Sequence, residues 1–431
     1  PDFIDMSGGN YRLSPGSPCM DIGTNIPELT ADLDGAVRPQ DGNGDGAAQW
    51  DMGAYESPPS TSGVLRCSFL GGPLVGLAPL MVVFQASVAG ADTNGLVYCW
   101  DIDGDGTNDQ SGAGLATVTN AYAPGLYSVA LTVSNAAATA QRSKAAYVTV
   151  QASEMYVATN GAHIAPFVSW ATAATNLAAT LALAGDGTTI TVSNGVYDCI
   201  EQGLQNAIVL RSVNGWMVTM LRNPPASTAR VLVLGHPQAV VEGFTLSGGL
   251  ANNASGGAVN MTAGTIRDCN LSNNTASVNG VGGAAYVTGG TIRDSIVTGN
   301  YGATGGGGLY LAGACLVSNC VIAGNRAEHG GGGVSVASAG AAVTHCAIIN
   351  NTNSYYNGGG GIYLSAGAVR NCLVARNRQT MDGNDRGGGG VRQSGGALIQ
   401  CTVAGNQVLG GNPAGGVWWS GGTITNTIVY G

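Results

Sequence analysis

The chain has 431 residues, of which 71 are glycine, 10% are charged and 44% are hydrophobic. Its formal net charge is −9, and 15 of its 25 acidic residues lie in residues 1–110. An acidic chain without basic clusters is a poor match for nucleic acid, and its hydrophobic content argues against disorder. No apolar run is long enough to cross a membrane as a helix, and the length predicts two to three domains.

Residues 1–56 contain two segments, residues 11–23 and 50–56, that resemble the closing segments of secreted bacterial β-helix proteins. The order Asp41-x-Asn43-x-Asp45-Gly between them matches the first half of a calcium loop. Ca²⁺ prefers several oxygen ligands, and glycine permits the sharp turn that brings them together. Residues 57–63, rich in Pro and Ser, are interpreted as a linker.

Residues 64–152 resemble a PKD-type immunoglobulin-like domain, which is a small β-sandwich and often a spacer in extracellular proteins. The residues that carry the resemblance are Ala78-Pro-Leu, Tyr98-Cys-Trp-Asp-Ile-Asp-Gly-Asp-Gly106, Tyr122-Ala-Pro-Gly-Leu-Tyr127 and Val129-Ala-Leu-Thr-Val133. Alternating apolar and polar residues in three of its segments agree with strands. Cys67 and Cys99 form a disulfide or stay free, and the sequence leaves both alternatives open.

A second calcium-loop pattern lies inside this domain. Its candidate ligands are Asp101, Asp103, Asp105 and Asp109. The position that holds a bidentate Glu in an EF-hand is Gly112 here, and no helices flank the loop, so the loop is not an EF-hand. The pattern predicts either a bound Ca²⁺ or an Asp-Gly turn that closes a hairpin.

Residues 153–239 are similar to the N-terminal caps of secreted bacterial β-helix proteins, through the run from Tyr156 past Trp170 to Tyr197. Residues 169–184 are rich in alanine and predict a helix, with Ser169 as its N-cap. A helix over the open end of a solenoid would block edge-to-edge association. We expect Trp170 and Leu181 to lie in the core of the cap.

A repeat of about 26 residues fills residues 240–431. Each copy places a small residue after an aliphatic residue and two polar ones, at Cys269, Ser295, Cys320, Cys346, Cys372, Cys401 and Thr427. A glycine-rich segment with period-two alternation precedes each of these phrases. Three short strands per repeat predict one coil of a parallel β-helix, which rises about 4.8 Å per coil and buries its inner face only when coils stack.

Two columns of the repeat are interpreted as structural ladders. The cysteines Cys269, Cys320, Cys346, Cys372 and Cys401 are expected to point inward as buried thiols, with disulfides between adjacent coils as the alternative. A second ladder consists of Asn274, Asn300, Asn325, Asn351, Asn377 and Asn406, whose amides are expected to bond along the axis. The residues that directly precede the column of small side chains, including His345, are expected at tight bends.

One outward column is a candidate for binding. Its residues Tyr286, Tyr310, Tyr363, Arg392 and Trp418 occupy the same position in successive first strands. Exposed aromatic side chains in a row predict a platform on which sugars stack. The alternative is an aromatic ladder that only supports the sheet through side-chain pairing.

The repeat half resembles right-handed parallel β-helix surface proteins, including polymorphic outer-membrane proteins and autotransporter adhesins. The resemblance rests on the Gly-Gly-aliphatic strands and on the six-residue runs that end in Asn. It implies an extracellular or cell-surface location, and it indicates the fold far more strongly than the function. The fold class is therefore all-β: a right-handed parallel β-helix, a PKD-type sandwich, and a β-helix closing segment at the N-terminus.

The search for an active site finds only scattered acids and histidines in the coils. They include Asp268, Asp294, Glu328, His329, His345, Asp382 and Asp385. β-Helix polysaccharide lyases and hydrolases use clustered acids on one strand face, and a glycosidase needs two carboxylates about 5–9 Å apart. The sequence also lacks a Gly-x-Ser-x-Gly motif and a phosphate loop. We therefore predict that the chain is not an enzyme.

The predicted function is that of a non-enzymatic extracellular structural protein. The unfinished coil at residues 424–431 would continue into a segment like residues 1–5, so we expect rods or filaments joined head to tail, or covalent tandem neighbours. The alternatives are a cell-surface adhesin that binds glycans along the aromatic column, and a polysaccharide lyase or hydrolase.

Overall fold

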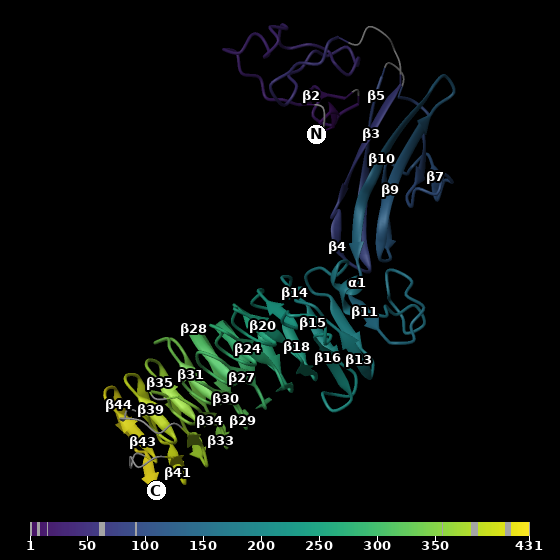
Figure 1. Ribbon diagram of the computed structural model, residues 1–431. Coiled ribbons are helices and arrows are strands. Elements are labelled where there is room, and N and C mark those ends of the chain that lie inside the picture. The colour runs from purple at the N-terminus through teal and green to yellow at the C-terminus, as the bar shows by residue number, and fades with distance from the viewer. Residues whose placement is uncertain are drawn as a thin grey trace. The chain divides into compact units, whose positions relative to one another are not determined.

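The computed structural model describes residues 2–6, 9–14, 16–59, 65–90, 93–355, 357–380, 387–409 and 415–430. In this part of the chain the structure is all-β, with one short helix. The chain forms two compact units, Pro1–Gln151 and Ala152–Gly431 (Figure 1). The first contains a short N-terminal segment and a β-sandwich, and the second is a β-solenoid of about nine coils. The predicted fold class is confirmed.

The sandwich consists of two sheets that enclose an aromatic core. The sheet β3–β5–β8 is antiparallel, and in the sheet β4–β10–β9–β6–β7 only β4 runs parallel to its neighbour. Phe69, Phe84 and Trp100 are fully buried between the sheets. The bounds are β3 Arg66–Gly72, β4 Val75–Leu77, β5 Leu80–Ala89, β6 Val97–Asp101, β7 Gln110–Gly112, β8 Thr117–Tyr122, β9 Gly125–Ser134 and β10 Thr139–Gln151.

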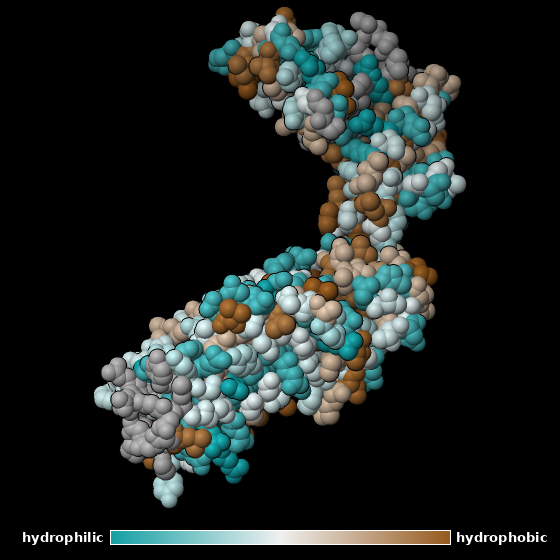
Figure 2. All heavy atoms as spheres, viewed as in Figure 1, coloured by the Kyte–Doolittle hydropathy of each residue, from teal (hydrophilic) through white to brown (hydrophobic). Residues whose placement is uncertain are grey.

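The N-terminal segment has little regular structure. Its strands β1 (Phe3–Asp5) and β2 (Asn10–Leu13) pair antiparallel. Asp2 joins the segment to the sandwich, because its carboxylate accepts hydrogen bonds from Lys144 Nζ at 2.8 Å and from the Ser68 hydroxyl. Burial opposes the charge of Asp2, but these hydrogen bonds lower its pKa. Large apolar side chains of the segment remain at its surface (Figure 2), so its own core is small.

The solenoid is built from three parallel sheets, and each coil adds strands to them in turn (Figure 1). The largest sheet contains β11 Glu154–Val157, β12 Thr189–Val192, β14 Gln202–Leu204, β15 Val209–Ser212, β17 Leu232–Leu234, β18 Val240–Glu242, β21 Val259–Met261, β22 Thr265–Arg267, β25 Ala285–Arg293, β28 Leu309–Ser318, β31 Val334–Val336, β32 Ala342–Thr344, β35 Ile362–Leu364, β36 Ala368–Arg370, β39 Val391–Gln393, β40 Ala397–Ile399, β43 Val417–Trp419 and β44 Thr423–Thr425.

The other two sheets have one strand per coil. The second contains β13 Gly195–Asp198, β16 Thr219–Arg222, β19 Thr245–Ser247, β23 Asn270–Ser272, β26 Ile296–Thr298, β29 Val321–Ala323, β33 Ala347–Ile349, β37 Leu373–Ala375, β41 Thr402–Ala404 and β45 Ile428–Tyr430. The third contains β20 Leu250–Asn252, β24 Thr275–Ser277, β27 Tyr301–Gly302, β30 Arg326–Ala327, β34 Thr352–Asn353, β38 Arg378–Gln379 and β42 Gln407–Val408.

The corner between the first two sheets repeats with the same backbone conformation. In seven successive coils one residue there has a positive φ between 48° and 54°, at Asp268, Asp294, Asn319, His345, Asn371, Gln400 and Asn426. Asn and Asp adopt this left-handed region more readily than most residues because their short polar side chains bond locally. His345 is thus a bend residue, and its Nε2 lies 3.2 Å from Asn371 Nδ2.

An uninterrupted ladder of asparagine side chains runs through the buried interior. In each step the backbone N–H and the side-chain amide donate to the Oδ1 of the next asparagine, at 2.9–3.0 Å. The ladder runs through Asn274, Asn300, Asn325, Asn351, Asn377 and Asn406, all of which are buried. Each amide also donates to a backbone carbonyl of the preceding coil, so these buried polar groups are satisfied.

The cysteine column belongs to the hydrophobic core of the solenoid. Cys269, Cys320, Cys346, Cys372 and Cys401 are buried and free. A hydrogen bond with a neighbouring thiol, together with burial, raises the pKa of Cys346 and Cys372, each to about 12, so these groups stay protonated and unreactive.

In the sandwich, the disulfide between Cys67 and Cys99 is not formed. Cys67 Sγ faces the Leu131 carbonyl in the core, whereas Cys99 Sγ lies 3.1 Å from the Ser111 hydroxyl.

The cap differs from its prediction in two respects. The helix α1 covers only Leu177–Leu181, and its N-cap is Asn176. Residues 171–173 do not continue it because their carbonyls accept hydrogen bonds from residues 162–164. Leu181 is partly buried and packs against the core. Trp170, however, is 44% exposed, so its predicted place in the core of the cap is wrong.

The ladder predicts a large penalty for a single interior substitution. Asn325→Ala removes the groups that bond to Asn300, to Asn351 and to the coil backbone, and leaves buried partners unsatisfied. We expect it to lower the stability of the solenoid by about 2–4 kcal/mol, measured by urea unfolding. Asn279→Ala serves as the control because Asn279 is exposed and its side chain bonds only to Asn253 among the described contacts. Equal effects of the two substitutions would contradict this account.

Candidate functional site

The candidate column is formed by the middle residues of the first strand of successive coils. The register places Asn260, Tyr286, Tyr310, Ser335, Tyr363, Arg392 and Trp418 next to one another along the axis. The residues on either side of Tyr310, Leu309 and Leu311, are fully buried. Because strand side chains alternate between the faces, the column points outward.

The column forms two aromatic groups. The rings of Tyr286 and Tyr310 are stacked, with their centroids 5.9 Å apart and an interplanar angle of 22°. Further along, the guanidinium carbon of Arg392 lies 5.5 Å from the ring centroid of Tyr363 and 4.7 Å from that of Trp418. These side chains are half-buried. Their spacing is set by the coil rise of about 4.8 Å, so the column presents at most one ring per coil.

Ser335 separates the two groups. It is buried, and its hydroxyl accepts a hydrogen bond from the N–H of Gly331 at 2.9 Å. Glycines let the neighbouring loop approach the column closely, since a Cβ on Gly330 would lie 2.7 Å from the Ser335 hydroxyl and one on Gly305 would lie 3.4 Å from the Tyr310 ring.

The loops before the first strands add polar groups at the edge of the column. Asn357 Oδ1 accepts a hydrogen bond from Arg392 Nη1 at 3.0 Å. Tyr355 lies in the same loop as Asn357, and its ring centroid is 4.3 Å from that of His329 in the corresponding loop of the preceding coil. Sequence reasoning missed Asn357 and Tyr355, although the extra residues between the asparagine ladder and the glycine run of this coil were a signal for them.

The remaining acids do not join the column. Asp268 and Asp294 lie at the corner between the first and second sheets. Asp294 bonds to Asn319 and pairs with Arg293, and these contacts lower its pKa. Glu328 is exposed and accepts a hydrogen bond from the Tyr301 hydroxyl at 2.6 Å. Burial together with Glu328 raises the pKa of Tyr301 to about 12, so the phenol stays neutral. Asp382 and Asp385 lie outside the described residues.

The aspartate loop of the sandwich brings three of its four candidate ligands together. One carboxylate oxygen from each of Asp101, Asp103 and Asp109 lies within 4.8 Å of the others. Backbone N–H groups of the loop hold these carboxylates, for example Gly104 N to Asp101 at 2.8 Å. Asp105 does not join the group; its carboxylate accepts two hydrogen bonds from Thr107, which lower its pKa.

The first aspartate loop is closed by hydrogen bonds of its own. The Asp41 carboxylate accepts from Gly44 and Gly46, and Asn43 Oδ1 accepts from the Asp45 N–H at 2.8 Å. Ca²⁺ binding by Asp41, Asn43 and Asp45 stays a prediction, because no contact in the structure tests it.

Asp21 is hydrogen-bonded to the backbone of this loop. Its carboxylate accepts hydrogen bonds from the N–H groups of Asn43 at 2.7 Å and Gly42 at 3.3 Å. Burial, with a contribution from the charges of Asp51 and Asp41, raises the pKa of Asp21 to about 6. Burial also raises the pKa of Glu56, the partner of Arg38.

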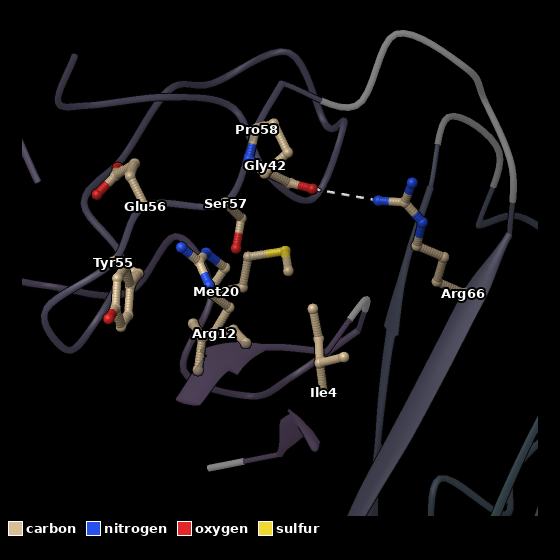
Figure 3. Close-up of a pocket in the computed structure, with 10 residues that line it drawn as sticks. Ile4, Arg12, Met20, Gly42, Tyr55, Glu56, Ser57, Pro58 and Arg66 are labelled. Atoms are coloured by element: carbon tan, nitrogen blue, oxygen red, sulfur yellow. Dashed lines mark hydrogen bonds between the residues drawn. The ribbon is translucent and has the colours of Figure 1, made fainter. Parts of the chain in front are cut away.

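A pocket of about 260 Å³ lies between this segment and strand β3 (Figure 3). Ile4, Met20 and Ser57 line it, and at its far side Arg66 Nη1 donates a hydrogen bond to the Gly42 carbonyl at 3.2 Å. The charged residues that line the pocket are of both signs, namely Arg12, Glu56 and Arg66. This pocket therefore has no clear charge preference for a ligand.

Comparison with known proteins identifies one domain. The PKD domain family matches residues 69–161, so the chain contains a PKD domain. PKD domains are typical of extracellular proteins. No curated protein matches the chain. Among the described residues, no helix is long and apolar enough to cross a membrane.

Solved structures that resemble the chain include the following two. Pectin methylesterase PemA from Erwinia chrysanthemi is 13% identical, with a TM-score of 0.33, over 59% of this chain and 80% of that one. Pectate lyase Pel9A is 18% identical, with a TM-score of 0.32, over 59% of this chain and 63% of that one. At this level of similarity the comparison shows the β-helix fold alone.

The comparison corrects the predicted function. The neighbours found for the solenoid are a pectin methylesterase and a pectate lyase, which are enzymes with β-helix folds. This finding contradicts the interpretation as a non-enzymatic structural module that forms rods or filaments head to tail. The sequence-based alternatives, which involve polysaccharides, fit the comparison better. Whether the chain is itself an enzyme, and whether it associates with itself, is not tested by these neighbours.

The buried acids of the N-terminal segment predict a stability that falls as the pH rises. Asp21 has a pKa of about 6 when folded and an ordinary value of 3.8, so the folded state binds more protons between these values. The stability contributed by protonated Asp21 is complete below pH 4 and is lost as the pH rises through about 6. Thermal unfolding at a series of pH values, followed by tryptophan fluorescence, measures this decline. Asp21→Asn should flatten it, and an unchanged decline in that variant would contradict the assignment.

Proposed function

We propose that the chain is an extracellular protein that binds an extended polysaccharide along the outward aromatic column of its solenoid. The observation that carries the proposal is the alignment of Tyr286 with Tyr310 and of Tyr363 with Arg392 and Trp418, one residue per coil. The apolar face of a pyranose ring packs against aromatic side chains, and its hydroxyls accept and donate hydrogen bonds. A sugar unit is comparable in length to the coil rise of about 4.8 Å, so a chain along the axis could keep in step with the coils.

The edges of the column supply polar partners for such a chain. Asn357 and His329 stand on the loops that border the column, and the Tyr363 hydroxyl is 3.5 Å from that of Ser394. Rings that are held by stacking lose little side-chain entropy on binding, which favours a preformed site. The PKD domain supports the extracellular part of the proposal.

Removing rings from the column should weaken this binding. Purified chain is run in gels that each contain one soluble polysaccharide, and its retardation measures affinity. Tyr310→Ala and Trp418→Ala should each weaken binding about fivefold, because one aromatic contact contributes about 1 kcal/mol. Tyr430→Ala is the control, since Tyr430 is 77% exposed and belongs to the second sheet.

The same samples separate binding from catalysis. We expect no new reducing ends or unsaturated products when the retarded polysaccharide is incubated with the chain. Depolymerisation that Tyr310→Ala abolishes would instead support a lyase or hydrolase. The absence of retardation by any polysaccharide, or an equal loss in Tyr430→Ala, would overturn the proposal.

We also propose that Asp101, Asp103 and Asp109 bind Ca²⁺. Ligands 2.3–2.6 Å from one ion lie at most about 5 Å apart, and the three carboxylates meet this condition. In this position the ion would neutralise part of the negative charge of the loop and brace the turn between β6 and β7.

Substitutions within the loop test this assignment. Ca²⁺ should raise the melting temperature of the chain, and Asp103→Asn should remove most of the rise while it keeps an acceptor for the Asp105 N–H. Asp105→Asn should leave the rise nearly intact, because Asp105 lies outside the group. Equal effects of the two variants would contradict the three-ligand site.

A further inference from the structure

A second aromatic surface lies on the first coils of the solenoid, away from the column. Trp170 is 44% exposed although it is one of the largest apolar side chains of the cap. Its ring packs against that of Tyr156, with centroids 4.6 Å apart and an interplanar angle of 58°. The tilt leaves much of the indole in contact with solvent, whereas the neighbouring Phe167 is buried.

Fixed polar groups surround this aromatic pair. The Tyr156 hydroxyl donates a hydrogen bond to Glu154 Oε2 at 2.8 Å, which fixes the phenol ring. Arg211 Nη2 lies 3.8 Å from Glu154 Oε1, and its Nε donates to the Thr191 hydroxyl at 3.1 Å. Tyr156, Thr191 and Arg211 follow one another in register along the sheet, so all point outward from the same face.

The charges of this surface determine the kind of ligand that it fits. Glu154 and Arg211 compensate each other, and both side chains are about half exposed, so the surface has no net charge to attract an ion. A carboxylate and a guanidinium beside an aromatic pair together offer acceptors and donors to neighbouring hydroxyl groups. An uncharged ligand with an apolar ring face and several hydroxyls could pack on the aromatic pair and form hydrogen bonds with Glu154 and Arg211.

We propose that Trp170, Tyr156, Glu154 and Arg211 form a second saccharide-binding site, which takes a neutral pyranose unit. The site is independent of the aromatic column, because Tyr156 is five strand steps from β25 in the register of the sheet, at about 4.8 Å per step. It binds the sugar face on the exposed indole and the hydroxyls through Glu154 and Arg211.

The experiment measures this site in a background in which the column is weakened. The variant Tyr310→Ala/Trp418→Ala of the full chain is titrated with cellohexaose, mannohexaose and hexagalacturonate, by calorimetry and by tryptophan fluorescence. We expect at least one neutral hexasaccharide to bind and to change the fluorescence. Added Trp170→Ala should weaken binding about fivefold, whereas Trp170→Phe should preserve most of it, and Trp419→Ala, which removes an exposed indole elsewhere, should have no effect.

Several results would overturn the proposal. These are no saturable binding of either neutral hexasaccharide, binding that Trp170→Ala leaves unchanged, or tighter binding of hexagalacturonate than of the neutral sugars. Glu154→Gln with Arg211→Gln should weaken binding without unfolding, since both side chains are exposed. Because every Trp170 variant is compared within one background in which the column is weakened, failure here leaves the column proposal standing, and failure of the column leaves this site measurable.

Discussion

The solenoid depends on the hydrogen bonding of polar groups that its own coils bury. Each coil contributes strands to three sheets and turns a corner between them, and each corner leaves backbone groups that the next coil must satisfy. Asn325 shows how this is done, because its side chain accepts two bonds from Asn300 and donates to Asn351 and to the Val297 carbonyl of the preceding coil. The ladder fixes the register of successive coils, and this register in turn aligns the outward side chains into columns.

The same constraint explains the unusual composition. Glycines at the start of the first strands lie against the backbone of the next coil; a Cβ on Gly332 would lie 2.2 Å from the Gly360 carbonyl oxygen. The inward positions and the glycine runs are thus occupied by small or apolar residues that pack the coils. Function must therefore be sought on the outward strand positions and on the loops, which is where the aromatic column and the Tyr156–Trp170 pair occur.

Features that repeat were predictable from the sequence. The spacing of about 26 residues, the corner residues and the asparagine ladder follow from one coil to the next, so each copy supports the others. Features that occur once were not. Local propensity predicts a helix for the alanine-rich segment. The carbonyls of residues 171–173 instead accept hydrogen bonds from residues 162–164, so the first part of the segment is not helical. Trp170 was assigned to a core because it is large, and only the fold shows it at the surface.

The candidate site shows the same division. Period-two alternation identified the column, but the pairing of Arg392 with Asn357 depends on a loop whose path the repeat does not encode. The calcium pattern named four aspartates, and the backbone turn brings only Asp101, Asp103 and Asp109 together. The distance between Arg392 and Asn357 and those among the three aspartates depend on the path of the folded backbone, which the sequence pattern does not give.

Hydrogen–deuterium exchange in the presence of a retarded polysaccharide tests the central claim most directly. The account predicts added protection in β25, β28, β35, β39 and β43, the strands that carry the column, and in the loop around Asn357. The strands of the second sheet, such as β33 and β37, should exchange as they do in the free chain. Protection confined to the second sheet, or no protection along the column while the polysaccharide is bound, would contradict it.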